Sequence, residues 1–343
     1  MGLNMWKPVP VEKAIGKKLL HDITLITEKT KGAIFRRGHI IKPEDVELLK
    51  NAGHYYVFVE ESVEEDVILE EEAVEDFAKY ISGPNTYIKK VEEGKAMIFA
   101  ERKGLLKVSY EGLLTVNSSG TFIVVTRQDN IGVSKGELIA VVDLVPLAIR
   151  KDEMKEMKVK IKKYLPLIYV KPFKRKKVGL IVTGTEIYEG RIKDLASDKV
   201  REKVEKYGGT VCETITLPDD EKLIKSKILE YVAKYDIVIL TGGMSVDPTD
   251  KTAKAIALTG AKIVAYGIPV KPTTMTMIAY LNSKPIIGVS SGIIYFKEKN
   301  VLDILLPKIM ADEYWAKEDI AKLGYGGIMP IYLMKKISKQ KHQ

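Results

Sequence analysis

The residues best suited to bind a ligand lie in segment 241–250, whose sequence is TGGMSVDPTD. Gly242 and Gly243 carry no Cβ, so their backbone N–H groups can closely approach a bound molecule. The serine, threonine and two aspartates after them add hydroxyl and carboxylate groups that can hold a phosphate, a hydroxyl or a hydrated cation. A simple turn followed by a helix cap at Asp250 would use the same residues, so the surrounding sequence must decide.

The same arrangement, an apolar run that closes on small polar residues, recurs in the second half of the chain. Each apolar run predicts a buried strand, and each polar segment after it predicts a loop. The runs are 178–182, 211–217, 237–240 and 285–289, and they are followed by Thr183-Gly184-Thr185-Glu186, Pro218-Asp219-Asp220-Glu221, segment 241–250 and Ser290-Ser291-Gly292.

Helical patterns separate these strands at 197–207, 221–235 and 250–258, where apolar residues recur three and four positions apart. Alternating strands and helices build a mostly parallel sheet that is covered by helices. Right-handed crossovers place the carboxyl ends of such strands at one edge, where α/β sheets bind ligands. The four polar loops are therefore expected to form one binding site.

Composition limits the class of protein. The 343 residues have an ordinary apolar and charged content, and no apolar run approaches the ~20 residues of a membrane helix. Since the N-terminus also lacks a signal-peptide pattern, we expect a cytoplasmic protein without a membrane partner. The single cysteine, Cys212, excludes an internal disulfide and a cysteine-built metal site, and its place in a predicted strand favours a buried thiol.

The net charge of +9 raises the question of nucleic-acid binding. Much of the excess lies in 151–177 and in the tail after 334, without the interleaved aromatic residues of a stacking surface. A solvated linker and an exposed terminus account for these runs more simply, so nucleic acid is not the expected partner. The charge still favours a small anionic ligand.

The first half of the chain predicts smaller modules. Residues 1–65 read as an α/β module with a helix at 42–52, and residues 66–172 read as a small, mainly β region with a basic linker. Residues 173–327 form the expected parallel-sheet domain, followed by a basic tail at 328–343. His21, His39 and His54 have spacings that suit no metal site.

Several motifs resemble those of MoaB/Mog molybdopterin-binding domains, and the whole chain resembles proteins related to molybdopterin molybdenumtransferase. The resemblance is strongest from about 177 to 327 and includes the opening region of that family. The motifs that carry it are Thr183-Gly184-Thr185-Glu186, Pro218-Asp219-Asp220, segment 241–250, Tyr266-Gly267-Ile268-Pro269-Val270, Gly324-Tyr325-Gly326-Gly327, Val9 to Leu20 and segment 35–45. The resemblance implies an α/β protein with a C-terminal three-layer αβα domain, preceded by smaller α+β and mainly β modules.

The resemblance also implies a site in which a pterin and its phosphate lie over the strand ends. The candidate catalytic residues are Asp250 and Asp219, and the candidate Mg²⁺ ligands are Asp247, Asp250 and Glu186. Asp219 or Asp220 could equally cap the helix that begins there. The expected ligand-binding residues are Thr183, Gly184, Glu186, Thr241, Gly242, Gly243, Ser245, Pro272, Ser290, Ser291 and Gly292.

The chain departs from the family at two Pro-Gly pairs. Pro272-Thr273-Thr274 and Ser290-Ser291-Gly292 stand in their places, and the cysteine-rich tail of many relatives is absent. A Cβ at Thr273 or Ser291 could block a phosphate, although the hydroxyls could replace the lost contact.

The function expected from this resemblance is binding of molybdopterin, or of the molybdenum cofactor, during cofactor biosynthesis or delivery. Self-association into a homo-oligomer and a molybdoenzyme client are implied. Three alternatives remain open: an Mg²⁺-dependent molybdopterin adenylyltransferase or molybdenumtransferase, a nucleotide pyrophosphatase-like enzyme with a nucleotide ligand, and an inactive scaffold.

Overall fold

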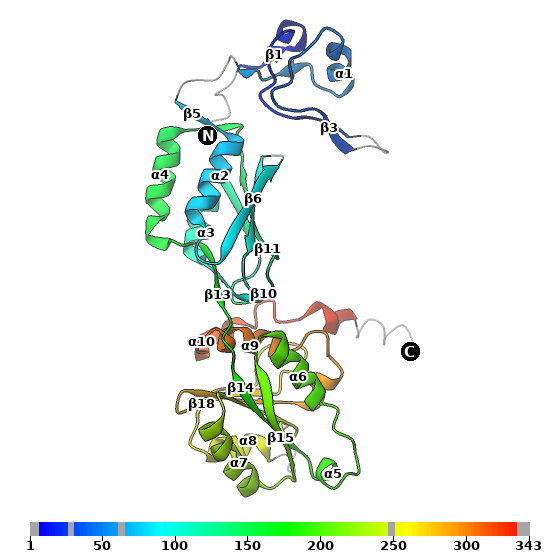
Figure 1. Cartoon of the computed structure of the whole chain (residues 1–343), viewed down its shortest axis with the longest axis vertical. Coiled ribbons are helices and arrows are strands. Elements are labelled where there is room, and N and C mark those ends of the chain that lie inside the picture. The colour runs from blue at the N-terminus through cyan, green and yellow to red at the C-terminus, as the bar shows by residue number, and fades with distance from the viewer. Residues whose placement is uncertain (1–6, 27–30, 61–65, 93, 246–250, 335–343) are drawn as a thin grey trace. The chain divides into compact units, whose positions relative to one another are not determined.

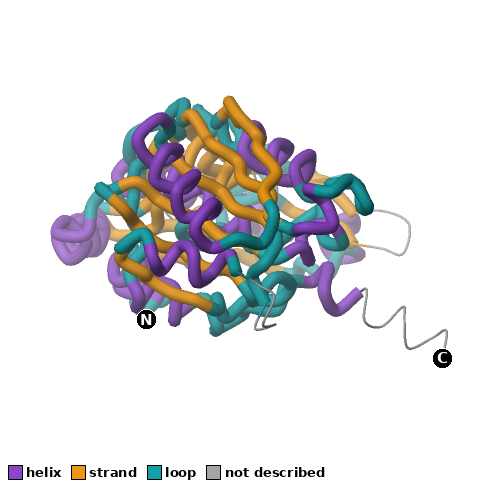
Figure 2. The backbone as a smooth tube through the Cα atoms, turned by 90° about the horizontal axis from the view of Figure 1, so that it is seen from below, coloured by secondary structure: helices purple, strands orange, loops and turns teal. Residues whose placement is uncertain are grey.

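The computed structural model describes residues 7–26, 31–60, 66–92, 94–245 and 251–334 (Figure 1). The chain forms two units that each draw on separate parts of the sequence. The first comprises 1–101, 108–127 and 136–169, and the second comprises 102–107, 128–135 and 170–343. Both helices and strands make up the chain, coloured purple and orange in Figure 2.

A six-stranded sheet organises the second unit, in the order β15-β14-β16-β19-β18-β17. β14 pairs in parallel with β15 and β16, and β16 pairs in parallel with β19. β18 runs antiparallel to both of its neighbours, so the prediction of a mostly parallel sheet is confirmed. The strands are β14 (Lys177–Thr183), β15 (Thr210–Leu217), β16 (Ile237–Thr241), β17 (Lys262–Tyr266), β18 (Thr276–Leu281) and β19 (Lys284–Val289).

Helices cover both faces of this sheet. On one face α6 and α9 pack through Val200, Val204 and Leu305, while α7 and α8 cover the other face through Ile228 and Ile256. The three-layer αβα arrangement is thus confirmed, and each such buried side chain contributes about 1.5–3 kcal/mol. The helices are α5 (Thr185–Tyr188), α6 (Ser197–Lys206), α7 (Glu221–Lys234), α8 (Thr252–Leu258), α9 (Leu302–Met310) and α10 (Lys317–Lys322), with a 3₁₀ helix at Ser291–Ile294.

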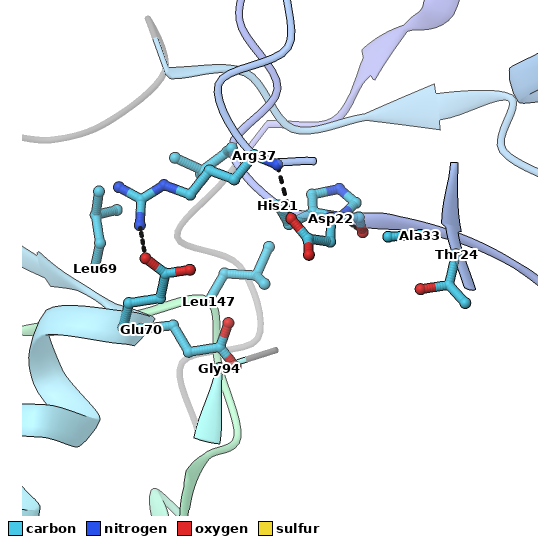
Figure 3. A pocket seen from close by; sticks show the side chains of 11 residues that line it. His21, Asp22, Thr24, Ala33, Arg37, Leu69, Glu70, Gly94 and Leu147 are labelled. Carbon is cyan, nitrogen blue, oxygen red and sulfur yellow. Dashed lines mark hydrogen bonds and ion pairs between the residues drawn. The ribbon is translucent and has the colours of Figure 1, made fainter. Parts of the chain in front are cut away.

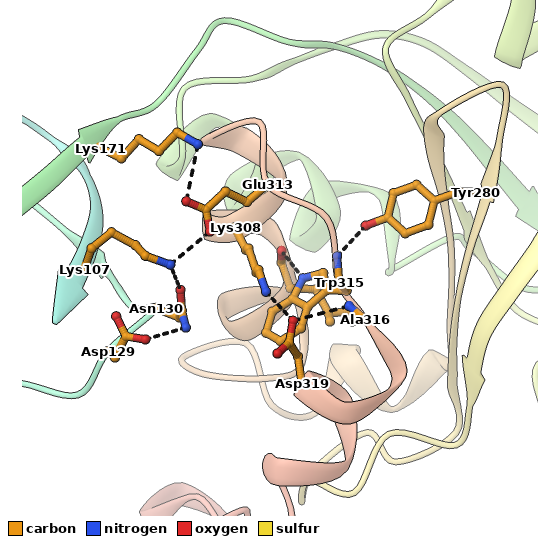
Figure 4. A network of polar contacts seen from close by, with 11 residues as sticks. Lys107, Asp129, Asn130, Lys171, Tyr280, Lys308, Glu313, Trp315, Ala316 and Asp319 are labelled. Carbon is orange, nitrogen blue, oxygen red and sulfur yellow. Dashed lines mark hydrogen bonds and ion pairs between the residues drawn. The ribbon is translucent and has the colours of Figure 1, made fainter. Parts of the chain in front are cut away.

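Two short segments from earlier in the chain belong to the second unit, where they form a small sheet with β13 (Ile168–Pro172) and make polar contacts. Lys107 forms an ion pair with Glu313 at 3.0 Å and donates a hydrogen bond to Asn130 (Figure 4). Lys171 contacts the same carboxylate from the other side at 3.3 Å. These contacts lower the pKa of Glu313 although its burial alone would raise it. The strands in these segments are β8 (Gly104–Val108) and β10 (Gly132–Val133), which pair antiparallel.

A four-stranded antiparallel sheet, in the order β6-β7-β11-β9, forms the centre of the first unit. Phe77 of α2 stacks on Phe122 of β9, with ring centroids 4.0 Å apart. The Asn117 side chain exchanges two hydrogen bonds with the backbone of Val124, which blocks that strand edge against pairing with another chain. The elements are β5 (Val67–Leu69), β6 (Thr86–Glu92), β7 (Lys95–Ala100), β9 (Phe122–Thr126), β11 (Leu138–Leu144), β12 (Ala148–Arg150), α2 (Glu70–Ile81), α3 (Tyr110–Asn117) and α4 (Lys151–Ile161).

Residues 7–60 have a small core of their own around Val11, Leu19, Ile23 and Leu49. The predicted helix at 42–52 is present but shorter, because its hydrogen-bonded turns begin only after Glu44. The elements are α1 (Asp45–Asn51), β1 (Val9–Pro10), β2 (Ile23–Ile26), β3 (Lys31–Phe35) and β4 (Tyr56–Val57), with a 3₁₀ helix at Val11–Ala14.

Two expectations differ from the structure. Residues 151–161 form helix α4 instead of a linker, because Met154, Met157 and Ile161 recur at helical spacing and are buried. The expectation that Cys212 is buried was wrong: β15 is an edge strand, and Cys212 lies on its exposed side next to buried Val211. Among the described residues, no helix has the length and apolarity needed to cross a membrane.

Candidate functional site

The polar loops meet in one depression at the carboxyl ends of β14, β15, β16 and β19. The depression has a volume of about 290 Å³, near the ~300 Å³ lower limit of small-molecule pockets. The structure therefore brings together most of the residues singled out from the sequence. Those that line the depression are Thr183, Gly184, Glu186, Asp219, Gly242, Gly243, Ser245, Ser290 and Ser291, joined by Ile187 and Met244.

Both glycines of the loop after β16 are required by their surroundings. Gly242 has φ +91°, and a Cβ there would stand 2.1 Å from the backbone oxygen of Thr183. Gly243 has φ +55°, and its Cβ would stand 2.5 Å from Oγ1 of Thr252. The loop thus lies directly against the end of β14 and the start of α8, a path closed to any residue with a side chain.

Two buried threonines, Thr183 and Thr252, support the loop after β16 from inside the protein. Oγ1 of Thr183 lies 2.7 Å from Oγ1 of Thr252 and 3.2 Å from the backbone oxygen of Thr241, to which it donates. The backbone N–H of Thr252 also donates to the carbonyl of Gly243. Thr252 was missed by the sequence reasoning, because a threonine in the first turn of a helix carries no local signal of such a contact. Thr241 supports the loop but does not line the depression.

Asp219 and Asp220 have different tasks, which answers the question that the sequence left open. Asp220 caps α7, where its side chain accepts hydrogen bonds from the N–H groups of Lys222 and Leu223. Asp219 instead accepts hydrogen bonds from both the N–H and the hydroxyl of Thr185, at 2.9 and 3.2 Å. This carboxylate therefore ties the β15–α7 loop to the β14–α5 loop at the mouth of the depression.

The depression offers neutral hydrogen-bond donors and carboxylates to a ligand. Ser290 and Ser291 bring hydroxyl groups to it from the end of β19, and Glu186 brings a carboxylate from α5. Within the part of the chain that the structure describes, its lining contains no lysine or arginine. An anion would have to be held there by N–H and hydroxyl groups or by a cation that the carboxylates bind.

Residues 272–274 lie apart from this lining. The Lys271–Pro272 peptide bond is cis, and Thr273 has φ +71°, a conformation that is uncommon for a β-branched residue. The Thr273 side chain is buried and accepts a hydrogen bond from the N–H of Val301 at 3.1 Å. Pro272 and Gly292, although expected at the site, do not line the depression. Thr273 consequently does not block it.

Asp247 and Asp250, two of the expected metal ligands, lie outside the described residues. The helix expected from Asp250 is described from Thr252 onward as α8. Among the residues that the structure does describe, no group of three or more histidine, cysteine, aspartate or glutamate side chains could hold a metal ion.

A second cavity, of about 240 Å³, lies in the first unit, and its lining includes Asp22, Glu70 and Glu71 together with Arg37 (Figure 3). The Arg37 guanidinium pairs with Glu71 at 3.3 Å, and the backbone N–H of Arg37 donates to the Asp22 carboxylate at 2.7 Å. Burial, assisted by the charges of Glu71 and Asp143, raises the pKa of Glu70 to about 7 from its ordinary 4.5. Arg37 opposes this shift and Asp22 adds to it, so Glu70 sits among more negative than positive charge.

The raised pKa of Glu70 predicts that the first unit loses stability as the pH rises from about 4.5 to 7. The folded state holds the proton more tightly than the unfolded state, so the favourable contribution is complete only below the unfolded pKa. Glu70→Gln should flatten this dependence and raise the melting temperature at pH 8 relative to the wild type. Thermal unfolding at pH 4.5 to 8 measures it, with Glu72→Gln in the exposed part of the same turn as the control. Equal responses of the two variants would contradict the prediction.

Comparison with known proteins identifies two segments. Residues 179–309 match the family described as "Probable molybdopterin binding domain", and residues 8–61 match a "Domain of unknown function (DUF8806)". The first match contains the sheet, the depression and most of the helices of the second unit.

Curated relatives match parts of the chain. A CinA-like protein of Citrifermentans bemidjiense is 35% identical over 81 residues, which are 24% of this chain and 20% of that protein. The molybdopterin molybdenumtransferase of Staphylococcus aureus (strain COL) is 29% identical over 130 residues, which are 36% of this chain and 31% of that protein. The chain thus matches less than a third of the length of either relative.

Among solved structures, the tungsten cofactor synthesizing protein MoaB from Pyrococcus furiosus is similar at 19% identity, with a TM-score of 0.33. The match covers 40% of this chain and 93% of that chain.

Proposed function

Because residues 179–309 carry a MoaB/Mog-like molybdopterin-binding domain, we propose that this protein binds molybdopterin, or a related phosphorylated pterin, during assembly or delivery of the molybdenum cofactor. The proposed site is the depression at the carboxyl ends of β14, β15, β16 and β19. The observation that carries the proposal is the convergence there of the glycine loop after β16 with the hydroxyls of Ser290 and Ser291.

The chemistry of the lining suits a phosphate monoester. Gly242 and Gly243 bring the backbone of their loop to the depression, and the two serines add hydroxyl donors from the neighbouring strand. Hydrogen bonds to a charged oxygen are worth about 1.5–3 kcal/mol each. Several such donors can bind an anion without a lysine or arginine.

A magnesium ion fits this site only in part. Glu186 lines the depression, and Mg²⁺ is commonly bound by one or two carboxylates together with phosphate oxygens. Asp219 is engaged with Thr185 in the structure, which leaves Glu186 as the described residue that would hold the ion. When bound, Mg²⁺ would neutralise charge on the phosphate.

We favour binding over catalysis as the proposal for this chain. The transferase activity in the name of the Staphylococcus aureus relative belongs to a protein of which this chain matches 31%. Homo-oligomer formation and delivery to a molybdoenzyme client are parts of the same proposal. Release of pyrophosphate or AMP in the presence of nucleotide, Mg²⁺ and pterin would instead favour the transferase.

Anaerobic calorimetry with molybdopterin tests the proposal. The wild type should bind at a single site, and the double variant Ser290→Ala/Ser291→Ala should bind at least ~10-fold more weakly, because two donors to the anion are lost. Ser226→Ala, on α7 and away from the lining, should leave the affinity unchanged. Absence of binding by the wild type would overturn the proposed ligand. Equal affinities of the wild type and the double variant would overturn the proposed site.

A further inference from the structure

The four-stranded sheet β6-β7-β11-β9 of the first unit has one face packed toward its helices and a second face that stays accessible (Figure 1). Successive side chains of a strand point to opposite faces, so the burial pattern identifies each face. In β7, alternate residues from Ala96 to Ala100 are buried, whereas Lys95 is exposed and Met97 and Phe99 are half-buried. We call the face that carries these last three residues the open face.

The two central strands, β7 and β11, place three pairs of neighbours on the open face. Each pair joins one residue of β7 to the residue of β11 that lies opposite in the ladder. The pairs are Phe99 with Leu138, Met97 with Val141, and Lys95 with Asp143. Two of the three pairs are therefore apolar, and the third combines opposite charges.

This composition is unusual for a face in contact with water. An antiparallel sheet with one solvated face normally turns its apolar residues inward and its polar residues outward. Here the apolar surface continues to the outer strands, through Tyr87 of β6 and Val125 of β9. Val125 is 59% exposed and Leu138 is 40% exposed. A continuous apolar patch of this kind marks an interaction surface.

The aromatic side chains of the open face do not form a platform for nucleobases. Tyr87 and Phe99 stack on each other with ring centroids 5.5 Å apart, and the ammonium of Lys89 lies 4.9 Å from the centroid of Phe99. Stacking on a base would require a free ring face, which Phe99 shares with these two neighbours. The surface is thus better suited to packing against another flat apolar face.

Pairing through the β9 edge of the sheet is blocked. The side chain of Asn117 occupies both the N–H and the carbonyl of Val124 in β9. A partner strand could not form those two hydrogen bonds without displacing it. The open face, rather than this edge, is therefore available for association.

The charges of the open face are complementary to those of a second copy of the same face. A two-fold axis that runs parallel to the strands, midway between β7 and β11, lays β7 of one copy over β11 of the other. Because Lys95 and Asp143 lie opposite each other in the ladder, this axis brings Lys95 of each copy over Asp143 of the other. The same operation stacks Met97 on Val141. Each contact occurs twice, as in an isologous interface.

We propose that the open face is a homodimer interface, in which two copies of the sheet pack face to face. The inference rests on the proposed function only in its self-association and not in its ligand. Four strands about 4.8 Å apart give a width of roughly 20 Å, and the seven residues of β11 give a length of roughly 24 Å. Two such faces bury on the order of 1,000 Å², which is near the lower limit for a specific interface. We therefore expect a dimer of only micromolar affinity.

Reversal of single charges tests the interface in the full-length protein. Lys95→Glu places two carboxylates at both symmetry-related contacts, and Asp143→Lys places two ammonium groups there. Each variant should dimerise at least ~10-fold more weakly than the wild type. An equimolar mixture of the two variants should dimerise again, because each then meets the opposite charge on the other. Sedimentation velocity from about 1 to 200 µM, which brackets a micromolar dissociation constant, measures all three.

Lys155→Glu is the matched control, since it makes the same charge change at an exposed residue of α4 and should dimerise like the wild type. A wild type that stays monomeric over this range overturns the proposal. Dimerisation of both single variants at the strength of the wild type also overturns it, because the dimer then uses another surface. A mixture that fails to restore the dimer overturns the opposition of Lys95 and Asp143.

Methionine oxidation in the wild type gives a second measurement that needs no variant to fold. Hydrogen peroxide in excess should oxidise Met97 more slowly as the protein concentration rises, because the second copy covers its side chain. Met334, which is 64% exposed in the second unit, should react at one rate throughout. A Met97 rate that is independent of concentration contradicts the interface. These experiments contain no pterin, so a dimer that binds no molybdopterin, or a monomer that binds it, separates this inference from the proposed ligand.

Discussion

Gly242→Ala is expected to lower the free energy of unfolding of the second unit by roughly 3 kcal/mol or more, and to abolish ligand binding in the depression. The added Cβ would stand 2.1 Å from the Thr183 backbone oxygen and 2.9 Å from its hydroxyl. A backbone atom of a buried strand cannot move aside, so the loop itself must shift. Its shift would break the contacts that hold Gly243 to Thr252.

Gly260→Ala is the control that separates steric conflict from backbone strain. Gly260 has φ +80°, close to the +91° of Gly242, but a Cβ there would have no neighbour within 4 Å. It should cost only about 1 kcal/mol, the usual penalty of a side chain in this conformation. Urea denaturation measures the free energy of unfolding of both variants, and hydrogen exchange in α7 and β16 measures the local stability around the loop. Equal losses would show that the close approach to Thr183 does not constrain the loop.

Four strands of the second half, β14, β15, β16 and β19, and the helices between them could be predicted from the sequence, because runs rich in apolar residues end there in polar loops. The antiparallel strands β17 and β18 were not predicted. Burial on both faces of a parallel sheet imposes the apolar pattern. β14 illustrates it, since Val178 to Thr183 are all buried. The convergence of Thr183, Gly242 and Ser290 then followed from topology alone, as parallel strands end at one edge.

Contacts between distant segments could not be predicted in this way. Thr252 and Tyr266 have no local pattern that shows what their hydroxyls meet, because their partners lie on other loops of the sheet. The exposure of Cys212 likewise depends on β15 lying at the sheet edge, which the pairing order decides. Asp219 could be separated from Asp220 only once the Thr185 contact was visible.

The glycine loop depends on small residues elsewhere as well as on its own. Gly288 in β19 leaves space for the Met244 side chain, and Met244 in turn fixes the loop whose carbonyls Tyr266 binds. The shape of the depression is therefore a property of several strands. A substitution outside the lining that moves the glycine loop can therefore change ligand affinity. A substitution of a buried residue far from this edge of the sheet should change stability alone.

Asp303→Ala provides that contrasting case and is expected to cost about 3–5 kcal/mol of stability in the second unit. Asp303 lies in α9, with a side chain that is 3% exposed, and it pairs with Lys203 of α6 at 2.6 Å and with Lys206 at 2.7 Å. The hydroxyl of Tyr207 donates to the same carboxylate at 2.9 Å. Removing the carboxylate leaves the Lys203 ammonium, whose side chain is 6% exposed, buried without its counter-charge.

The same ion pairs set the pH dependence of this contribution. Burial alone would raise the pKa of Asp303, but hydrogen bonds from Lys203 and Lys206 outweigh it and lower that pKa below 3.8. The stabilisation is therefore complete above pH ~4 and is lost as the pH falls through the lowered pKa. Denaturant titrations at pH 7 and pH 3 should show a large difference between wild type and Asp303→Ala at pH 7 that narrows in acid. Glu202→Ala removes the exposed partner of Lys199 on α6, so it should change the free energy of unfolding little at either pH. If Asp303→Ala loses no more stability than Glu202→Ala, the buried carboxylate does not join α6 to α9. If the loss caused by Asp303→Ala is the same at pH 3 as at pH 7, the lowered pKa of Asp303 is contradicted.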